Sequence, residues 1–255
     1  MQIIDAHAYV GESLFGFTRT PESLLSAMDR LRIAKAVLCP NKPSLYALEP
    51  ANRLVATAVK QHPDRFYGWV RVDPWQGKNA LAELKLGIES LGLHGLLLHP
   101  YEELFQISDH KVDMLMEYAQ TANVPVMIEA GYHLLSHPLD VAEMANRFPG
   151  VQFIGTHGLQ MDDAGFALTD SDLAMRECSN LVMESAGMYA PENMLGVVQK
   201  LGVERLIFGS HSPWLNMQFE IDRIHLLALT ESQKEAVFGG NILKYLHVNV
   251  TTGAL

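Results

Sequence analysis

Short runs of apolar, β-branched and aromatic residues recur along the chain, and a segment with helical periodicity follows each run. Near-continuous apolar runs of this length are typical of strands buried on both faces of a sheet. Parallel strands need crossover connections, so the alternation predicts a parallel sheet covered by helices. The eight predicted strands are residues 2–5, 35–40, 66–74, 93–100, 124–131, 151–158, 180–187 and 205–213.

The helical segments carry start signals at both ends of the chain. Thr20 precedes Pro21, which is the arrangement of an N-cap followed by proline in the first helical turn. Thr230 and Gln233 have the spacing of a capping box. A last helix is therefore predicted over about residues 230–246, where it packs on the sheet.

Closure of the eight strands into a (β/α)8 barrel is the most economical architecture, and we expect one domain over residues 1–255. A doubly wound open sheet is the competing fold. That fold would carry a glycine-rich phosphate-binding turn after its first strand, and the segment DAHAYVGES contains none.

Composition narrows the class of protein. Apolar residues make up 48% of the chain, which excludes a disordered protein. With 29 acidic and 19 basic residues the formal charge is −10, which argues against nucleic acid or an anionic membrane as partner. The apolar stretches are too short to span a bilayer, and the N-terminus lacks the features of a secretion signal, so we expect a cytoplasmic protein. A small molecule is the expected partner, and homo-oligomer formation stays open.

The two cysteines, Cys39 and Cys178, are too few and too far apart for a disulfide framework or a thiolate zinc site. Any metal site must therefore use histidine and carboxylate ligands.

Ionisable residues end most of the predicted strands, and in a barrel these ends form the active site. On the first strand, alternation predicts that Asp5, His7 and Tyr9 point to the same side, toward the barrel axis. Glu184 lies one residue too early on its strand, and we rank it second. The strand-end candidates are Asp5, His7, Tyr9, Arg71, Asp73, His99, Glu129, His157, Glu184 and His211.

Six segments in chain order are similar to the motifs of one known family. IIDAHAYVG resembles an opening strand of the form D-x-H-x-H-x-G, and GLLLHP resembles a fourth strand of the form G-x-K-x-H-P. The other four are VPVMIEAG, FPGVQFIGTHG, RLIFGSHSPW and GGNILKYL. On these motifs the chain resembles the amidohydrolase superfamily, in the amidohydrolase-related branch that includes aromatic-acid decarboxylases, hydratases and lactonases. The resemblance spans nearly the whole chain.

The resemblance implies a metal site, for which the family uses two histidines on strand 1, one each on strands 5 and 6, and an aspartate on strand 8. This chain keeps His7 and His157 but has Tyr9, Glu129 and His211 at the other three positions. Three imidazoles and one carboxylate still form a credible ligand set for a divalent ion. We predict that His7, Glu129, His157 and His211 bind one such ion, zinc in the first instance, with manganese or iron as alternatives.

Catalysis is assigned to two histidines. His211 stands where the family has an aspartate that both binds metal and moves protons. An imidazole bound through one nitrogen cannot easily do both, so we expect His99 to move protons, because an ordinary histidine titrates near about 6.5.

Three residues are expected to orient the substrate. Tyr9 can donate to a developing oxyanion, Arg71 can hold a substrate carboxylate in a bidentate manner, and Trp214 follows the last strand at the barrel mouth. The alternatives are a packed aromatic role for Tyr9 and an ion pair between Arg71 and Asp73.

Three functions stay open. The preferred one is a metal-dependent hydrolase acting on a small carboxylated or cyclic ester or amide. The alternatives on the same barrel are a decarboxylase and a metal-independent lactonase, in which His211, His157 and Glu129 act as acid and base groups. The third is a catalytically inactive homologue that binds a ligand, against which the number of retained ionisable groups weighs.

Overall fold

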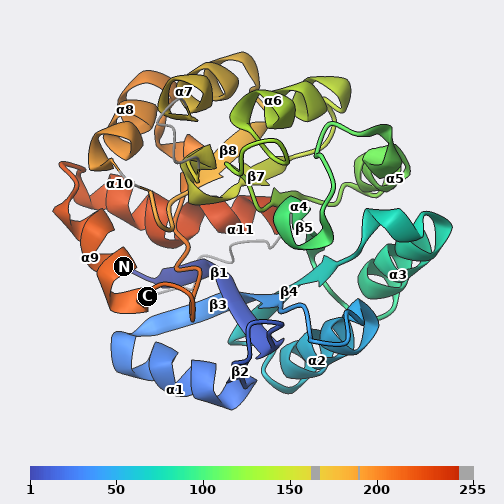
Figure 1. Cartoon of the computed structure of the whole chain (residues 1–255). Coiled ribbons are helices and arrows are strands. Elements are labelled where there is room, and N and C mark those ends of the chain that lie inside the picture. The colour runs from blue at the N-terminus through green and yellow to red at the C-terminus, as the bar shows by residue number, and fades with distance from the viewer. Residues whose placement is uncertain (162–166, 189, 247–255) are drawn as a thin grey trace.

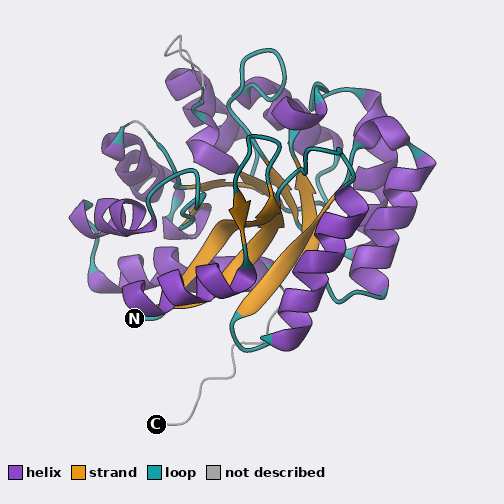
Figure 2. Ribbon diagram, turned by 60° about the horizontal axis from the view of Figure 1, so that its bottom comes forward, coloured by secondary structure: helices purple, strands orange, loops and turns teal. Residues whose placement is uncertain are grey.

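The strands lie side by side in one curled sheet, in the order β2-β1-β3-β4-β5-β6-β7-β8-β9 (Figures 1 and 2). The computed structural model describes residues 1–161, 167–188 and 190–246. The strands are β1 (Ile3–Glu12), β2 (Thr18–Arg19), β3 (Ile33–Pro40), β4 (Phe66–Arg71), β5 (Gly95–Leu98), β6 (Val126–Ile128), β7 (Phe153–Gly155), β8 (Leu181–Glu184) and β9 (Leu206–Ile207).

Helices surround the sheet on its outer side, as Figures 1 and 2 show. They are α1 (Pro21–Leu31), α2 (Leu48–Gln61), α3 (Lys78–Glu89), α4 (Pro100–Glu103), α5 (Asp113–Ala122), α6 (Pro138–Arg147), α7 (Ala167–Glu177), α8 (Pro191–Leu201), α9 (Met217–Leu226), α10 (Glu231–Glu235) and α11 (Asn241–Tyr245). Each predicted strand is present with a helix after it, although most strands are shorter than the apolar runs. The Thr20 hydroxyl caps α1, and Thr230 and Gln233 form a full capping box, as predicted.

Backbone hydrogen bonds close the sheet between its first and last segments. Ala8 forms a parallel bridge with Ser212, the Tyr9 amide donates to the Ser212 carbonyl over 2.8 Å, and the Ala6 amide donates to Phe208 over 3.1 Å. All neighbours from β1 and β3 to β9 are parallel, and only β2 pairs antiparallel with the end of β1. The predicted (β/α)8 barrel is therefore confirmed.

The first strand departs from simple alternation. Its pairing with β3 shifts register between Asp5 and Ala8, and as a result Ile4 and Tyr9 both lie in the cluster inside the barrel. Strict alternation would place residues five apart on opposite faces. The expectation that Asp5 shares a face with Tyr9 is wrong for this reason: the Asp5 carboxylate instead accepts the backbone N–H groups of His7 and Ser210.

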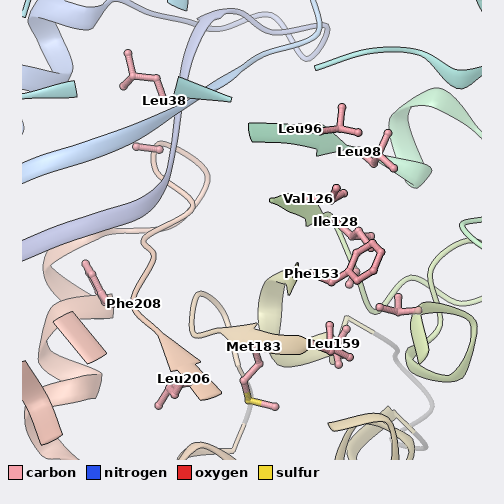
Figure 3. Close-up of a cluster of buried hydrophobic side chains, with 14 of the residues drawn as sticks. Leu38, Leu96, Leu98, Val126, Ile128, Phe153, Leu159, Met183, Leu206 and Phe208 are labelled. Carbon is pink, nitrogen blue, oxygen red and sulfur yellow. The ribbon is translucent and has the colours of Figure 1, made fainter. Parts of the chain in front are cut away.

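Two apolar layers hold the barrel together. The outer layer lies between the sheet and the helices, and Figure 3 shows part of it on neighbouring strands, including Leu96, Ile128 and Phe153. The inner layer fills the barrel and includes Trp69 together with Ile242 of α11. The C-terminal helical segment thus covers the end of the barrel opposite the strand C-termini. In the described part of the chain, no helix is long and apolar enough to cross a membrane.

Candidate functional site

The carboxylate of Glu129 is the centre of a buried polar cluster at the C-terminal end of the barrel. Glu129 directly follows β6 and its side chain is fully buried. Its Oε1 accepts the Tyr9 hydroxyl and lies 2.7 Å from His7 Nε2, while its Oε2 accepts from Thr156 Oγ1 over 3.0 Å and lies 3.1 Å from His157 Nε2. Residues of β1 and residues that follow β7 therefore converge on one carboxylate at the end of β6.

His7 is held between two carboxylates. Its Nε2 faces Glu129, and its Nδ1 lies 3.3 Å from Oε2 of Glu184 at the end of β8. Glu184 is itself fixed, because its two oxygens accept the backbone N–H groups of Ala186 and His157. Glu184, a second-rank candidate in the sequence analysis, therefore orients the His7 ring through the nitrogen that faces away from Glu129.

His157 lies just after β7, where its backbone has a left-handed φ of 55°. Such a backbone costs of order 1 kcal/mol for a residue other than glycine, so the surrounding contacts must hold it in place. Its Nδ1 lies 3.0 Å from the Ala186 carbonyl, which can only accept, so Nδ1 carries the proton. The other ring nitrogen, Nε2, faces Oε2 of Glu129, to which it donates when it is protonated, and a divalent ion bound there would take the place of that proton.

His211 completes the cluster from the segment after β9, also with a left-handed φ, of 50°. Its Nε2 is 3.9 Å from Oε1 of Glu129, and its ring centroid is 4.6 Å from that of His7 and 4.5 Å from that of His157. Its side chain is 12% exposed, whereas those of His7 and Glu129 are fully buried. Of these three side chains, that of His211 is therefore the one in contact with solvent.

Charges inside the cluster offset the effect of burial. Burial alone would raise the pKa of Glu129, but His7 and the hydrogen bonds from His157 and His7 hold that pKa well below its usual range. Burial would lower the pKa of His7, but Glu129 and Glu184 raise it to about 10. For His211, burial and the neighbouring histidines keep the pKa well below its ordinary value, so its imidazole is neutral.

Ligand atoms of His7, Glu129 and His211 all lie within 4.8 Å of one another, which is the spacing that a shared ion requires. Imidazole nitrogen and carboxylate oxygen are the usual ligands of zinc and related ions at about 2.0–2.2 Å. The donor set therefore fits a divalent ion. His157 stands next to this group, against the second oxygen of Glu129.

Trp214 lies at the open side of the cluster. Its ring stacks with that of His211 at 6.3 Å between centroids, and its edges meet Phe15 and Phe17. The Trp214 residue is 38% exposed, so one face of an aromatic wall is accessible beside His211. Its role in substrate binding stays a prediction.

His99 lies apart from the cluster, as the N-cap of the one-turn helix α4. Its Nδ1 accepts the Glu102 amide over 3.3 Å, and its ring stacks with Tyr132 at 6.4 Å. Burial, with the positive charge of Arg71, lowers the pKa of His99 to about 4. The imidazole is therefore neutral at pH 7, and a pKa this far below 7 makes it a weaker proton acceptor than the ordinary histidine on which its predicted role rests.

Arg71 is fully buried and engaged with protein carboxylates. Its Nη2 donates to Glu102 over 2.6 Å and to Glu103 over 2.7 Å, and Nη1 donates to the Pro40 carbonyl. The alternative pairing with Asp73 is not observed among the described residues. Asp73 instead accepts the Trp75 amide and starts a short 3-10 turn, so the strand ends at Arg71. Contact of Arg71 with substrate stays a prediction.

Three polar residues at the site are not among the candidates predicted from the sequence. Thr156 donates to Glu129, and Ser136 Oγ donates to the Glu129 backbone carbonyl over 2.9 Å. Ser210 binds Asp5 through both its amide and its hydroxyl, and this contact joins β1 to the segment that carries His211. Small hydroxyl residues are common in loops, so only their position next to predicted strand ends could have drawn attention to them.

Solved structures with the same fold include enzymes. The uncharacterised TIM-barrel protein Bb4693 from Bordetella bronchiseptica is 16% identical, with a TM-score of 0.79, over 97% of this chain and 99% of that chain. A 5-carboxyvanillate decarboxylase from Sphingomonas paucimobilis is 15% identical, with a TM-score of 0.76 and the same coverage. A dihydroxybenzoic acid decarboxylase from Polaromonas sp. JS666, with bound manganese and the inhibitor 2-nitroresorcinol, is 14% identical, with a TM-score of 0.77 over 97% of each chain.

At these identities the likeness shows the fold alone. No curated protein matches the chain. A family model is more specific than either comparison, because it describes the sequence pattern as well as the fold. The model described as amidohydrolase matches residues 21–248, which is the barrel from α1 onward, and the chain therefore belongs to the amidohydrolase family of enzymes.

Proposed function

We propose that this protein is a metal-assisted hydrolase that acts on a small carboxylated or cyclic ester or amide. The observation that carries the proposal is the convergence of His7, Glu129 and His211 within 4.8 Å at the C-terminal end of the barrel. In the structure these buried groups partner one another, and a shared divalent ion would take the place of the proton between His7 and Glu129. Zinc is the proposed ion, with manganese or iron as alternatives.

The residues around the ion have distinct tasks in this proposal. Glu129 supplies the negative charge, and Glu184 and the Ala186 carbonyl fix the ring orientations of His7 and His157. A divalent ion held here supplies Lewis acidity, which polarises a substrate carbonyl and activates water. His157 is the fourth proposed ligand.

Proton transfer and substrate orientation fall to residues around this centre. His99 is the proposed proton-transfer group, and because burial lowers its pKa to about 4 it would pass a proton on rather than hold it at neutral pH. His211 is both ligand and the group nearest to solvent, and Trp214 offers an aromatic face to a flat substrate. Tyr9 and Arg71 are the further proposed substrate contacts, although in the described structure both donate to protein carboxylates.

Elemental analysis of protein purified without chelator or histidine tag tests the proposal. We expect about one equivalent of divalent metal in the native protein, and its loss in His7→Ala and Glu129→Ala. His110→Ala is the matched control, because His110 is exposed and outside the cluster. Absence of metal after supplementation with zinc, manganese and iron in turn would refute the metal-assisted mechanism and leave acid–base chemistry by His211, His157 and Glu129.

Decarboxylation is the second candidate, because two of the similar solved structures are named as decarboxylases of aromatic acids. The two reactions differ in their products. Release of CO2 from hydroxybenzoates, with esters and lactones left intact, would favour the decarboxylase, and the reverse pattern would favour the hydrolase.

A further inference from the structure

A cavity lies outside the barrel, between α1 and the segment that follows His211. Its volume is about 660 Å³, within the range of about 300–1,000 Å³ that small-molecule sites occupy. Arg19 of β2, Arg30 on α1 and residues 212–218 form its walls. Figure 1 shows the two bounding helices, α1 and α9, as neighbours around the barrel.

The charge of this cavity is opposite to that of the whole protein. Its described lining includes two arginines and no aspartate or glutamate, whereas the chain carries a formal charge of −10. Within the described part of the chain, neither Arg19 nor Arg30 forms a salt bridge. Two guanidinium groups thus share a cavity whose described lining holds no carboxylate, although Asp5, outside the lining, acts electrostatically on Arg19.

Arg19 is held in place but incompletely satisfied. Its Nη1 donates to Ser212 Oγ over 3.2 Å, and Nη2 has only a weak contact with Met217 Sδ at 4.0 Å. Its Nε is buried and has no hydrogen-bond partner among the described residues. An unsatisfied buried donor is unfavourable, more so when it belongs to a charged group. Burial lowers the pKa of Arg19, Asp5 opposes this shift, and the like charge of Arg30 adds to it.

We propose that this cavity binds the phosphate or carboxylate group of a small organic anion, with Arg19 and Arg30 as its ligands. Both anions present the paired oxygens that a guanidinium binds in a bidentate manner. Ala27, Leu31 and Leu215 in the same lining offer apolar surface to the organic part of the ligand. The cavity adjoins the Glu129 cluster, because Ser212 and Trp214 of its lining follow His211 in the chain, but none of the four proposed metal ligands lines it.

Calorimetric titration at low ionic strength tests this site, with inorganic phosphate, phenyl phosphate and benzoate as probes. We expect phenyl phosphate or benzoate to bind more tightly than inorganic phosphate, because of the apolar lining. Tighter binding of phenyl phosphate indicates a phosphorylated ligand, and tighter binding of benzoate indicates a carboxylated one. Arg19→Gln and Arg30→Gln are each expected to weaken binding at least about 10-fold, which corresponds to the loss of a charge-assisted hydrogen-bond pair.

Arg32→Gln is the matched control, because Arg32 is an exposed arginine next to α1 that does not line the cavity. The affinity of Arg32→Gln for the preferred probe should stay within about twofold of the native value. Arg30 is exposed, so Arg30→Gln remains informative even where Arg19→Gln fails to fold. Absence of binding for all three probes, or equal affinity in native protein and Arg30→Gln, would overturn the proposal.

His7→Ala separates this site from the metal centre, because anions can also bind a metal. We expect His7→Ala to lose metal yet to bind the preferred probe with native affinity. Loss of probe binding together with metal would place the anion at the metal centre and refute the second site. The outcome does not depend on whether the proposed hydrolase activity is found.

Discussion

Nε2 of His7 lies 2.7 Å from Oε1 of Glu129, so one buried contact joins β1 to the end of β6. Removing the carboxylate leaves His7 buried without its main counter-charge, which typically costs about 3–5 kcal/mol. Glu129→Gln should therefore lower the free energy of unfolding in the presence of chelator by about that amount, measured in urea. Glu117→Gln, on the exposed face of α5, should change it by less than about 0.5 kcal/mol. Equal stability of the two variants would contradict the ion pair.

Glu184 acts on the proposed metal through His7. Loss of a carboxylate behind a ligating histidine typically weakens metal affinity by about 10–100-fold. We expect Glu184→Gln to lower zinc affinity by that factor in competition with a chelator. Glu192→Gln, an exposed residue at the start of α8, should leave zinc affinity unchanged. Native zinc affinity in Glu184→Gln would show that the 3.3 Å contact with His7 has no role in binding.

Arg71 balances the buried carboxylates of Glu102 and Glu103. Arg71→Met should therefore lower the free energy of unfolding by about 3–5 kcal/mol. Adding Glu103→Gln should restore part of that loss, since residues that share a charge network are coupled. Urea denaturation of both single variants and the double variant measures this coupling. A higher KM at native stability would instead assign Arg71 to the substrate.

His99 makes stability depend on pH. Its folded pKa, lowered mainly by burial, is about 4, whereas an unfolded histidine titrates near 6.5. As the pH falls through this interval the unfolded chain takes up a proton that the folded chain does not, so stability present above 6.5 is lost toward pH 4. Between pH 7 and pH 5 this loss is about 2 kcal/mol. His99→Gln should show a correspondingly shallower decline in urea unfolding, and parallel curves would contradict the low pKa.

Trp214 is expected to affect substrate binding more than metal binding. It stacks beside His211 without contributing a ligand atom. Trp214→Ala should raise KM by about 10-fold or more while metal content stays at the native level, whereas Trp214→Phe should retain most of the affinity. Steady-state kinetics tests the expected rise in KM, and elemental analysis of the same preparations tests the expected metal content. A loss of metal in Trp214→Ala would mean that the ring instead supports His211.

The barrel and most of the cluster could be predicted from sequence because both follow from local pattern. Each strand is an apolar run before a helix, and a residue that follows such a run necessarily lies at the catalytic end. Glu129 and His211 were found in this way. Glu184 was ranked too low because its position within β8 says nothing about the two backbone amides that turn its carboxylate toward His7.

Contacts between distant loops and shifts of register could not be predicted. The partners of Arg71 lie more than thirty positions away, on a one-turn helix that has no strong periodic signal. Asp73, the nearer carboxylate, starts a turn instead. The register shift between β1 and β3 could not be predicted either. An extra residue in one strand is recognised only when its pairing with the neighbouring strand is known.

The junction at which Ala8 pairs with Ser212 closes the barrel, and it determines how early during synthesis the Glu129 cluster can form. Its two sides are about two hundred residues apart, so it is among the last contacts that a growing chain can make. His211 lies beside this junction, so it can face Glu129 only after the segment that follows β9 has been synthesised. A nascent chain that stops short of this segment therefore lacks the complete cluster, and loading of the proposed metal would follow, rather than guide, the folding of most of the barrel.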